Sequence, residues 1–345
     1  MKRFLLAAGL AAAALSGGAQ ADAEFLARPD VQRYIDEQVA TGQFNRPELE
    51  AVFANVEIKP NIIKILDKPS TSRPWYEFRP TFYNERLIKG GLAFWEQNQA
   101  TLERAERTYG VPPEMVVAIL GIETNYGRNT GSFRLADALS TIAFNYPRRA
   151  EYFRGELTEF LKLSKEEGID PLALKGSYAG AMGLPQFMPS SFRKWAVDFS
   201  GDGHRNIWSN VDDAIGSVAY YFQLHGWRHG DDVVIPAAIQ PGVNVDQLVA
   251  DKFNLHYTVG QLKTMGVLPQ AQVADSVQAV LVPLETGPGV TQYWLGLNNF
   301  YTITRYNKST LYAKVAQELA DELRLRYMTS RAQAQPPAPA ADPAP

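Results

Sequence analysis

Glu123 occupies a position in this sequence that suits an acid catalyst. It follows the apolar run Met115 to Ile122, inside the stretch "VVAILGIETNYG". Loss of hydration disfavours a carboxylate and raises its pKa, and the partial negative charge at a helix C-terminus acts in the same direction. A carboxylic acid that keeps its proton near neutral pH can protonate a glycosidic oxygen. The alternative is a structural glutamate tied to a backbone donor.

Two polar, glycine-containing segments could form the surroundings of this acid. Gly121 permits a close approach to the helix, and "ETNYG" predicts a polar turn with Tyr126 as an aromatic lip. The stretch "GSYAGAMGLPQFMPSSF", residues 176–192, is too irregular for a core element. It suits a cleft wall where backbone and small side chains approach a sugar ring. By itself it could also be an ordinary glycine-rich loop.

A third segment, "DFSGDGHRNIWSNVD" over residues 198–212, begins like an EF-hand loop. Asp198, Ser200 and Asp202 stand at positions 1, 3 and 5, and Gly203 stands at the turn position, 6. The backbone carbonyl of His204 would be the next ligand. Position 12 is serine, so the next acid, Asp212, comes late and the loop is longer than the standard one. We predict a structural Ca²⁺ site, with a plain Asp/Gly turn as the alternative.

The composition is that of a globular protein, with 46% hydrophobic and 21% charged residues among 345. The formal net charge of −3 gives no indication of a surface for nucleic acid or another polyanion. There is no cysteine, so no disulfide can stabilise the fold.

Residues 1–21 have the pattern of a secretory signal peptide. Lys2 and Arg3 precede an apolar run over 4–15, and Ala19-Gln20-Ala21 has a small-x-small cleavage pattern. The run is too short to span a membrane, and a buried N-terminal helix is the alternative. We predict cleavage after Ala21. Since a lipoprotein anchor needs a cysteine, we expect a soluble periplasmic protein without a membrane anchor.

Hydrophobic periodicity and capping signals predict a mainly helical chain up to about residue 230. Asn45 and Glu48 have capping-box spacing, as do Thr258 and Gln261. The helices expected from the pattern cover 30–39, 61–67, 85–109, 112–123, 152–163 and 211–224. The proline-interrupted stretch 68–80 is expected to be irregular. Residues 231–290 contain short β-type runs and a short helix near 258–265.

Together these segments resemble the membrane-bound lytic transglycosylase B family of bacterial cell-wall enzymes. The resemblance runs in family order from about Trp75 to Tyr312 and covers most of the mature chain. The motifs that carry it are "GIETNYGRNTGSF", "FNYPRRAEYF", "SYAGAMGLPQFMPSSF", "DFSGDGHRNIW" and "LGLNNFYTITRYNKSTLYA". The chain lacks the lipidation cysteine of the family's prototype, which favours a soluble form.

The resemblance implies an α+β, mainly α fold with a goose-lysozyme-like catalytic core. Combined with the patterns above, it predicts an N-terminal α region over 22–109, the core over 110–230 and a small β-rich insertion over 231–290. A return to the core with a C-terminal helix is expected over 291–329, where Leu311, Val315, Leu319 and Leu323 form an apolar ladder. Residues 330–345, mostly Ala, Pro and Gln, predict a disordered tail.

The resemblance also implies the reaction. Members of the family cleave the β-1,4 bond between N-acetylmuramic acid and N-acetylglucosamine and leave a 1,6-anhydro ring. We find no second acid in a comparably apolar setting, so Glu123 would act alone, assisted by the acetamido group of the substrate. No catalytic cofactor is expected. The alternatives are hydrolysis by water, as in a lysozyme-type muramidase, and a non-catalytic peptidoglycan-binding protein.

The binding roles implied by the resemblance fall on residues far apart in the chain. They are Ser177, Gln186, Tyr220, Tyr306, Asn307 and Tyr312, with Tyr178 and Met182 from the glycine-rich stretch and Phe78 as an aromatic cleft residue. Arg148 and Arg149 could hold stem-peptide carboxylates. Core packing is the alternative for the tyrosines, and a solvated surface for the arginine pair. The expected partners are peptidoglycan glycan strands and penicillin-binding proteins or other cell-wall enzymes.

Overall fold

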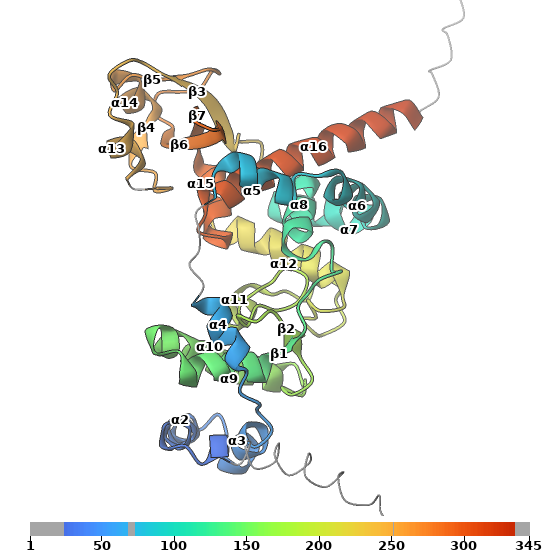
Figure 1. The fold of residues 1–345 in the computed structure, drawn as a ribbon. Coiled ribbons are helices and arrows are strands. Elements are labelled where there is room, and N and C mark those ends of the chain that lie inside the picture. Colours follow the sequence, from blue (N-terminus) through green and yellow to red (C-terminus); the bar gives the residue numbers. More distant parts are fainter. Residues whose placement is uncertain (1–23, 68–72, 251, 335–345) are drawn as a thin grey trace, which may run out of the picture. The chain divides into compact units, whose positions relative to one another are not determined.

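The computed structural model describes residues 24–67, 73–250 and 252–334, and the expected signal peptide lies outside them (Figure 1). The chain divides into two compact units. Unit 1 combines residues up to Ser70 with Thr130–Trp195, and unit 2 combines Thr71–Asn129 with the chain from Ala196 onward. Each unit is therefore assembled from two separate stretches of sequence, which is a different division from the consecutive regions expected.

Unit 1 is helical apart from one pair of two-residue strands. Its elements in chain order are α2 (Pro29–Ala40), α3 (Arg46–Phe53), α4 (Pro60–Leu66), β1 (Phe133–Arg134), α9 (Leu135–Asn145), the 3₁₀ turn η1 (Pro147–Arg149), α10 (Ala150–Glu166), β2 (Lys175–Gly176) and α11 (Pro189–Trp195). The expected capping box at α3 is confirmed, because Asn45 and Glu48 each bond the other's backbone N–H.

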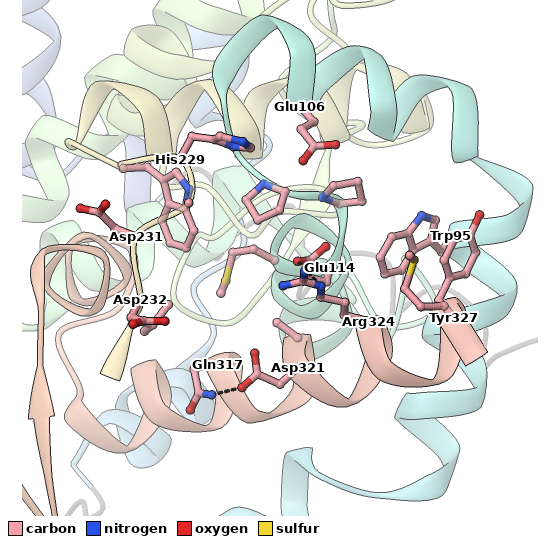
Figure 2. A pocket seen from close by; sticks show the side chains of 18 of the residues that line it. Trp95, Glu106, Glu114, His229, Asp231, Asp232, Gln317, Asp321, Arg324 and Tyr327 are labelled. Atoms are coloured by element: carbon pink, nitrogen blue, oxygen red, sulfur yellow. Dashed lines mark hydrogen bonds and ion pairs between the residues drawn. The ribbon is translucent and has the colours of Figure 1, made fainter. Parts of the chain in front are cut away.

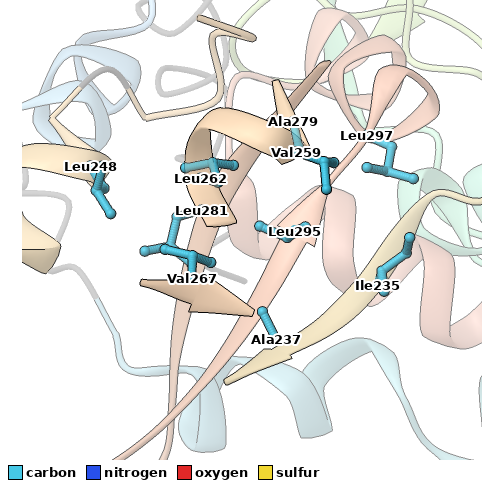
Figure 3. Packing of buried hydrophobic residues seen from close by; sticks show 10 residues of the cluster. All are labelled: Ile235, Ala237, Leu248, Val259, Leu262, Val267, Ala279, Leu281, Leu295 and Leu297. Atoms are coloured by element: carbon cyan, nitrogen blue, oxygen red, sulfur yellow. The ribbon is translucent and has the colours of Figure 1, made fainter. Parts of the chain in front are cut away.

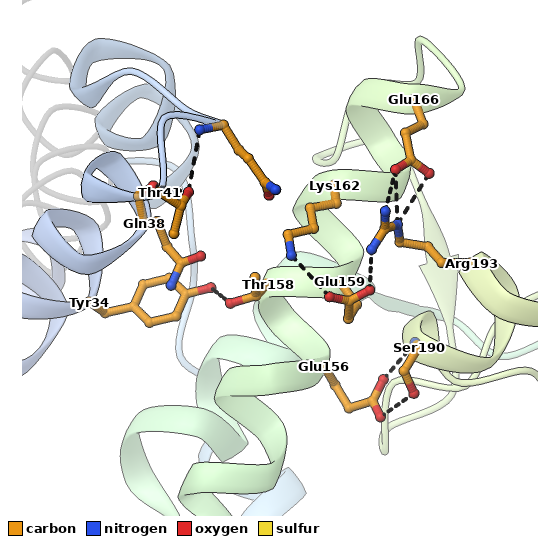
Figure 4. A network of polar contacts seen from close by, with 11 residues as sticks. Tyr34, Gln38, Thr41, Glu156, Thr158, Glu159, Lys162, Glu166, Ser190 and Arg193 are labelled. Atoms are coloured by element: carbon orange, nitrogen blue, oxygen red, sulfur yellow. Dashed lines mark hydrogen bonds and ion pairs between the residues drawn. The ribbon is translucent and has the colours of Figure 1, made fainter.

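Aromatic rings and a polar network hold the helices of unit 1 together. The rings of Phe25, Tyr34 and Phe53 surround that of Phe144 on α9 at centroid distances of 5.6, 5.7 and 6.4 Å. Figure 4 shows the polar contacts of α10, where Thr158 bonds the hydroxyl of Tyr34 at 2.8 Å. The buried Glu156 accepts from the backbone N–H and the hydroxyl of Ser190 on α11. These contacts fix α10 to α2 and to α11.

Unit 2 contains the longest of the described helices and a five-stranded sheet. Its elements are α5 (Trp75–Phe82), α6 (Glu85–Gln97), α7 (Gln99–Tyr109), α8 (Pro113–Thr124), α12 (Val211–Leu224), β3 (Val234–Ile239), α13 (Val245–Val249), β4 (Tyr257–Thr258), α14 (Val259–Thr264), β5 (Val267–Pro269), β6 (Gln278–Gly287), β7 (Val290–Gly296), α15 (Asn298–Tyr306) and α16 (Thr310–Ala334). The helix α12 has the expected bounds, and the capping box of Thr258 and Gln261 opens α14.

The structure corrects four expectations about these elements. The helix expected over 85–109 is broken at Asn98, whose backbone leaves the helical region between α6 and α7. The stretch expected to be irregular contains α5, with Pro80 inside the helix. The β-rich region continues past residue 290 to Gly296, because β7 pairs with β6 and β3. The C-terminal helix continues to Ala334, into the stretch expected to be disordered.

The five strands form an antiparallel sheet with the order β4-β6-β7-β3-β5. Figure 3 shows the apolar cluster that supports it. Val259 and Leu262 of α14 are fully buried with Val267 of β5 and Leu295 of β7. β3 alternates between buried and partly buried residues, whereas β6 buries four consecutive residues, Ala279 to Val282, so the region has a core of its own. The prediction of a mainly helical chain with a small β region is confirmed.

The helix α8 lies in the core of unit 2. Every residue from Met115 to Gly121 is buried, and α8 packs against α16, α6, α7 and α12. On α16 the residues Val315, Leu319 and Leu323 of the expected ladder are completely buried. None of the described helices combines the length and the apolar composition needed to cross a bilayer.

Candidate active site and metal-binding loop

Glu123 is placed by the last turn of α8, as the sequence predicts. The helix ends at Thr124, because the next two residues, Asn125 and Tyr126, take left-handed backbone conformations with φ of 50° and 60°. Their N–H groups bond the carbonyls of Gly121 and Leu120 and close the helix end. Glu123 is partly buried there, at the boundary between an apolar helix and a polar turn.

Tyr126 is not the aromatic lip expected from the sequence. Its ring folds back across Gly121, where an added Cβ would lie 2.5 Å from the Tyr126 hydroxyl oxygen. The hydroxyl donates to the carbonyl of Leu87 on α6 at 2.8 Å, and the ring stacks on Phe94. The close approach expected at Gly121 is therefore made by a side chain of the same chain. It fixes the end of α8 against α6 and so positions Glu123.

The hydroxyl of Tyr312 donates a hydrogen bond to Oε1 of Glu123 at 2.5 Å. Tyr312 lies in the first turn of α16 and is buried. Burial raises the pKa of Glu123 to about 7, and the hydrogen bond from Tyr312 opposes this shift. The raised pKa expected from the sequence is confirmed, with desolvation as its main cause. Glu123 can hold or release a proton near neutral pH.

Tyr306 lies near the same carboxyl. Burial raises its pKa well above 10, and the charge of Glu123 adds to the effect. Its ring packs on Tyr221 at 5.0 Å and on Phe222 at 5.7 Å. Tyr221 also donates to the carbonyl of Arg305 at 2.7 Å, so α12 fixes the end of α15. Tyr221 is not among the residues expected from the sequence, although its place on the buried face of the predicted helix indicates a packing role.

The remaining expected residues of unit 2 lie on three elements. Tyr220 is partly buried on α12 and contacts the ring of Tyr109 at 5.5 Å. Asn307 is exposed directly after α15. Phe78 is partly buried on α5, stacked against Trp75 and close to Phe82.

In unit 1 the glycine-rich stretch forms a self-bonded loop. The Ser177 hydroxyl accepts from the backbone N–H of Ala181 at 2.9 Å, and the Gln186 amide donates to the carbonyl of Gly183 at 2.9 Å. Gln186 itself has a positive φ of 52°. The carbonyl carbon and oxygen of Gly176 would lie about 2.2 and 2.1 Å from a Cβ at Gly131, so the backbones touch there. The irregular conformation expected from the sequence is thus held by internal bonds.

The loop residues differ in how accessible they are. Tyr178 is 39% exposed, whereas Met182 is completely buried. The backbone of Met182 exchanges two hydrogen bonds with Phe187. This corrects the expectation for Met182: its side chain belongs to the core of the loop and is not available to a substrate. Arg148 and Arg149 are both exposed in η1, and Arg149 lies over the ring of Tyr152 at 5.0 Å.

Three carboxylates converge where the loop after α11 meets the first turn of α12. Asp198, Asp202 and Asp213 each offer an oxygen atom, and these atoms lie within 4.8 Å of one another. Asp198 accepts from the backbone N–H groups of Gly201, Asp202 and Gly203, and the bond from Gly203 is the main cause that lowers its pKa. The donor set consists of oxygen atoms in a turn of charged residues, which fits a calcium ion.

The structure corrects one residue of the predicted metal set. Asp213, not Asp212, joins the triad, and its buried carboxylate accepts from the N–H groups of Phe199, Ser200 and Asn206. Asp212 bonds the hydroxyl of Thr101 at 2.7 Å instead. Successive helical residues point about 100° apart, so 213 shares the buried face of α12 with Ser217 and Tyr221. The helical spacing of 213, 217 and 221 in the sequence could therefore have identified Asp213 as the third carboxylate.

The hydroxyl of Ser200 bonds Asp198 at 3.2 Å, and the backbone N–H of His204 bonds Asp202 at 2.9 Å. Both residues therefore belong to the loop as predicted, although a ligand role for them is a prediction only.

A separate cavity of about 640 Å³ lies at the opposite end of α8 (Figure 2). Glu114 of α8, Asp231, Asp232 and Asp321 of α16 line it, together with the stacked rings of Trp95 and Tyr327. The described residues that line this cavity include none of the expected site residues. Glu123, at the other end of the same helix, is not among the residues that line it.

Residues 27–321 match the family model described as "Transglycosylase SLT domain". The chain is 45% identical over 317 residues to membrane-bound lytic murein transglycosylase B of Escherichia coli (strain K12), which covers 89% of this chain and 86% of that protein.

Solved structures of similar chains have the same fold. Soluble lytic transglycosylase SltB1 from Pseudomonas aeruginosa is 45% identical with a TM-score of 0.82, over 86% of this chain and 99% of that one. The Escherichia coli lytic transglycosylase Slt35, solved in complex with calcium, is 44% identical with a TM-score of 0.80, over 88% and 95%. SltB3 from Pseudomonas aeruginosa, solved in complex with NAG-anhNAM-pentapeptide, is 28% identical with a TM-score of 0.75, over 85% and 78%.

Proposed function

This chain belongs to the transglycosylase SLT domain family, and we propose that Glu123 supplies both the acid and the base of its reaction. The protein is a lytic murein transglycosylase that acts on peptidoglycan. The observation that carries the role of Glu123 is its setting: a carboxyl at the end of a buried helix, bonded to Tyr312, with its pKa raised to about 7 by burial. Such a group can donate a proton and take one back in a single turnover.

The proposed reaction uses one carboxyl in two steps. Glu123 donates its proton to the oxygen of the β-1,4 bond between N-acetylmuramic acid and N-acetylglucosamine, and the bond from C1 to that oxygen breaks. The 2-acetamido group of the substrate stabilises the cationic C1. The Glu123 carboxylate then accepts the proton of the C6 hydroxyl, whose oxygen bonds to C1 and forms the 1,6-anhydro ring. The proton balance is restored without water or a cofactor.

We further propose two sets of glycan-binding side chains, one in each unit. In unit 2 these are Phe78, Tyr220, Tyr306, Asn307 and Tyr312, of which Tyr312 and Tyr306 have interactions with Glu123. In unit 1 they are Ser177, Tyr178 and Gln186 of the glycine-rich loop, with the exposed Arg148 and Arg149 for stem-peptide carboxylates. The peptidoglycan fragment in the SltB3 structure supports a substrate of this class. Penicillin-binding proteins or other wall enzymes are proposed as protein partners.

Calcium is the proposed cofactor, with a structural role only. Asp198, Asp202 and Asp213 would hold it, with oxygen atoms of Ser200 and His204 completing the site. The calcium complex of Slt35 supports this assignment. A bound divalent cation would offset the repulsion between three carboxylates within 4.8 Å and so stabilise the loop that precedes α12.

Replacement of Glu123 by glutamine tests the proposal. The amide keeps the shape of the side chain and cannot donate or accept the proton, so turnover should fall by at least roughly 10²–10⁴-fold while glycan binding and the melting temperature stay near those of wild type. Activity is measured as soluble muropeptide released from purified peptidoglycan. A variant that kept near-wild-type turnover would move the catalytic role to another residue.

The product distinguishes the reaction from hydrolysis. Anhydro-muropeptides are about 18 Da lighter than hydrolysed ones, which is the mass of the water that hydrolysis adds. Mass spectrometry of the digest should show the lighter series. The heavier series would indicate a lysozyme-type muramidase, and no released product would indicate a binding protein.

A further inference from the structure

Lys314 is a buried charge that the proposed reaction does not use. It lies in the second turn of α16, and its side chain is 1% exposed. Its ammonium contacts Glu318 at 2.6 Å and lies 4.2 Å from the ring of Trp294 on β7 and 5.8 Å from that of Trp75 on α5. Burial lowers the pKa of Lys314, and Glu318 opposes the shift. An unpaired buried charge is costly, so these contacts must compensate for lost hydration.

The contacts of Lys314 continue along one face of α16. Lys314, Glu318, Glu322 and Arg326 are spaced four residues apart, which places them on one stripe of the helix. Glu318 accepts from Arg79 of α5, and Glu322 accepts from the hydroxyl of Tyr83 directly after α5 at 2.9 Å. Arg326 bonds Glu85 at the start of α6 at 2.7 Å. We call these four residues of α16 the charged stripe.

A different face of α16 serves the acid. Tyr312 precedes Lys314 by two residues, so the two side chains point about 200° apart around the helix. Tyr312 bonds Glu123, while Lys314 contacts α5 and β7. The first turns of α16 therefore lie between the catalytic helix α8 and the helix α5. Displacing α5 from the charged stripe need not disturb the bond between Tyr312 and Glu123.

Two chains of contact lead from Lys314 to the aromatic side chains of α5. The ammonium lies over Trp75, and Phe78 stacks on Trp75 with ring centroids 6.4 Å apart at 27°. Glu318, bonded to Lys314, also bonds Arg79, the residue next to Phe78. Glu318 is thus shared between a cation of α16 and a cation of α5, and both links constrain the position of Phe78.

We propose that Lys314 is a positioning residue for glycan binding: with Glu318 and Arg79 it holds α5 so that Phe78 presents its ring to the substrate. The inference rests on the binding role proposed for Phe78. Lys314 does not touch the reacting atoms. Its loss weakens substrate binding and leaves the proton transfers of Glu123 intact.

Steady-state kinetics on soluble peptidoglycan glycan strands test this role. Lys314→Met removes the charge and keeps an unbranched apolar side chain, and Arg79→Met breaks the same link from the more exposed α5 side. Each variant should raise KM by roughly fivefold and keep kcat within about twofold, because only binding contacts are displaced. The double variant should raise KM by about as much as Lys314→Met alone, because Lys314 takes part in both chains of contact and Arg79 in only one of them. Lys314→Arg keeps the positive charge, so its KM should stay close to the wild-type value.

Arg324→Met is the matched control on the same helix. Arg324 is exposed, with its nearest carboxylate, Glu114, at 4.0 Å, so KM should stay at the wild-type value. Binding of the same strands is also measured in the Glu123→Gln background, which makes the result independent of turnover. Should Lys314→Met fail to fold, the test is made with Arg79→Met, Glu318→Gln and the double variant that combines these two changes.

Three results would overturn the proposal. A lower melting temperature with unchanged KM and kcat in both Lys314→Met and Arg79→Met would make the link purely structural. A reduced kcat at unchanged KM would show that Lys314 acts through Tyr312 instead of α5. A rise in KM in Arg324→Met equal to that in Lys314→Met would make the effect general to α16. Phe78→Ala tests the binding role of Phe78 separately from the positioning role of Lys314. An unchanged KM in Phe78→Ala would refute the binding role of Phe78 itself.

Discussion

At the residue scale, the reactivity proposed for Glu123 depends on two opposing effects. Burial at the end of α8 disfavours the carboxylate, while the hydroxyl of Tyr312 donates to it and favours it. Desolvation is the larger effect, so the pKa of Glu123 is raised to about 7. An acid of this pKa is protonated in an appreciable fraction of molecules at neutral pH, which the first step of the reaction requires.

Tyr312→Phe should move the alkaline limb of the pH–rate profile to higher pH. Activity falls as pH rises through the pKa of Glu123, because the deprotonated side chain cannot act as the acid. Removing a donor to the carboxylate raises that pKa further, by about one unit if the charged hydrogen bond contributes roughly 1.5 kcal/mol. The measurement is kcat/KM against pH.

Tyr220→Phe is the control for this prediction. Tyr220 contacts Tyr109, and the hydrogen bond to Glu123 comes from Tyr312. The alkaline limb of the pH–rate profile of Tyr220→Phe should coincide with that of the wild-type protein. An alkaline limb that stays in place in Tyr312→Phe would show that the hydroxyl does not stabilise the carboxylate in solution.

At the element scale, the end of α8 is fixed by a close contact between a helix and an aromatic ring. Gly121 leaves room for Tyr126, whose hydroxyl reaches the carbonyl of Leu87 on α6. This arrangement requires free space above the helix backbone at Gly121, because any side chain at that position would occupy the space of the Tyr126 ring. The position of Glu123 in the last turn depends on this contact.

Gly121→Ala should destabilise the protein by roughly 1–3 kcal/mol, the usual cost of forcing atoms into a filled site. Its Cβ would lie 2.5 Å from the hydroxyl oxygen and 2.7 Å from Cζ of Tyr126. Gly155→Ala on α10 is the matched control, because nothing lies within 4 Å of its Cβ. That variant should be more stable than wild type by about 0.5–1 kcal/mol. Urea unfolding curves measure both, and equal effects would contradict the packing described.

Calcium should raise the melting temperature of the wild-type protein, because a ligand of the folded state alone stabilises that state. Magnesium should be less effective, since it demands a stricter octahedral site. Asp202→Asn should abolish the calcium shift, whereas Asp212→Asn should keep it because Asp213 completes the triad. Asp202→Asn should also remain active at low temperature. A folded, thermally normal but inactive Asp202→Asn would place the loop in the catalytic site.

At the scale of the whole molecule, the two units are each built from separated stretches of one chain. In unit 2 the helix of Glu123 packs against a helix that begins almost two hundred residues later, and Tyr312 lies 189 positions from Glu123. The aromatic helix α5 contacts the same α16. The long helix α16 therefore contacts both the helix that carries Glu123 and the helix that carries Phe78, and it also supplies Tyr312, the hydrogen-bond donor to Glu123.

We propose that the exported chain begins at Asp22. The physical reason is the pattern of the leader, in which Lys2 and Arg3 precede a short apolar run and Ala19-Gln20-Ala21 stands before the cleavage point. Intact-mass spectrometry of the protein purified from an exporting host measures the N-terminus. A mass that still includes residues 1–21 would contradict the prediction.

Features that depend on neighbours along the chain were determined by the sequence itself. The apolar run before Glu123, the glycine at 121, the capping boxes at Asn45 and Thr258, and the bounds of α12 all follow from residues a few positions apart. Helix periodicity and capping are local interactions, so spacing alone predicts them. The raised pKa of Glu123 could be predicted for the same reason, since an acid at the end of an apolar helix loses hydration.

Only the tertiary structure decided which groups meet across long stretches of chain. It gave Glu123 its bond to Tyr312, turned Tyr126 inward onto Gly121, and placed Asp213 instead of Asp212 in the carboxylate triad. It also buried Lys314 between two tryptophans, where the spacing predicts only an ordinary helical lysine. Side-chain partners of this kind are selected by packing between elements, and the free energy of that packing depends on residues that no local pattern contains.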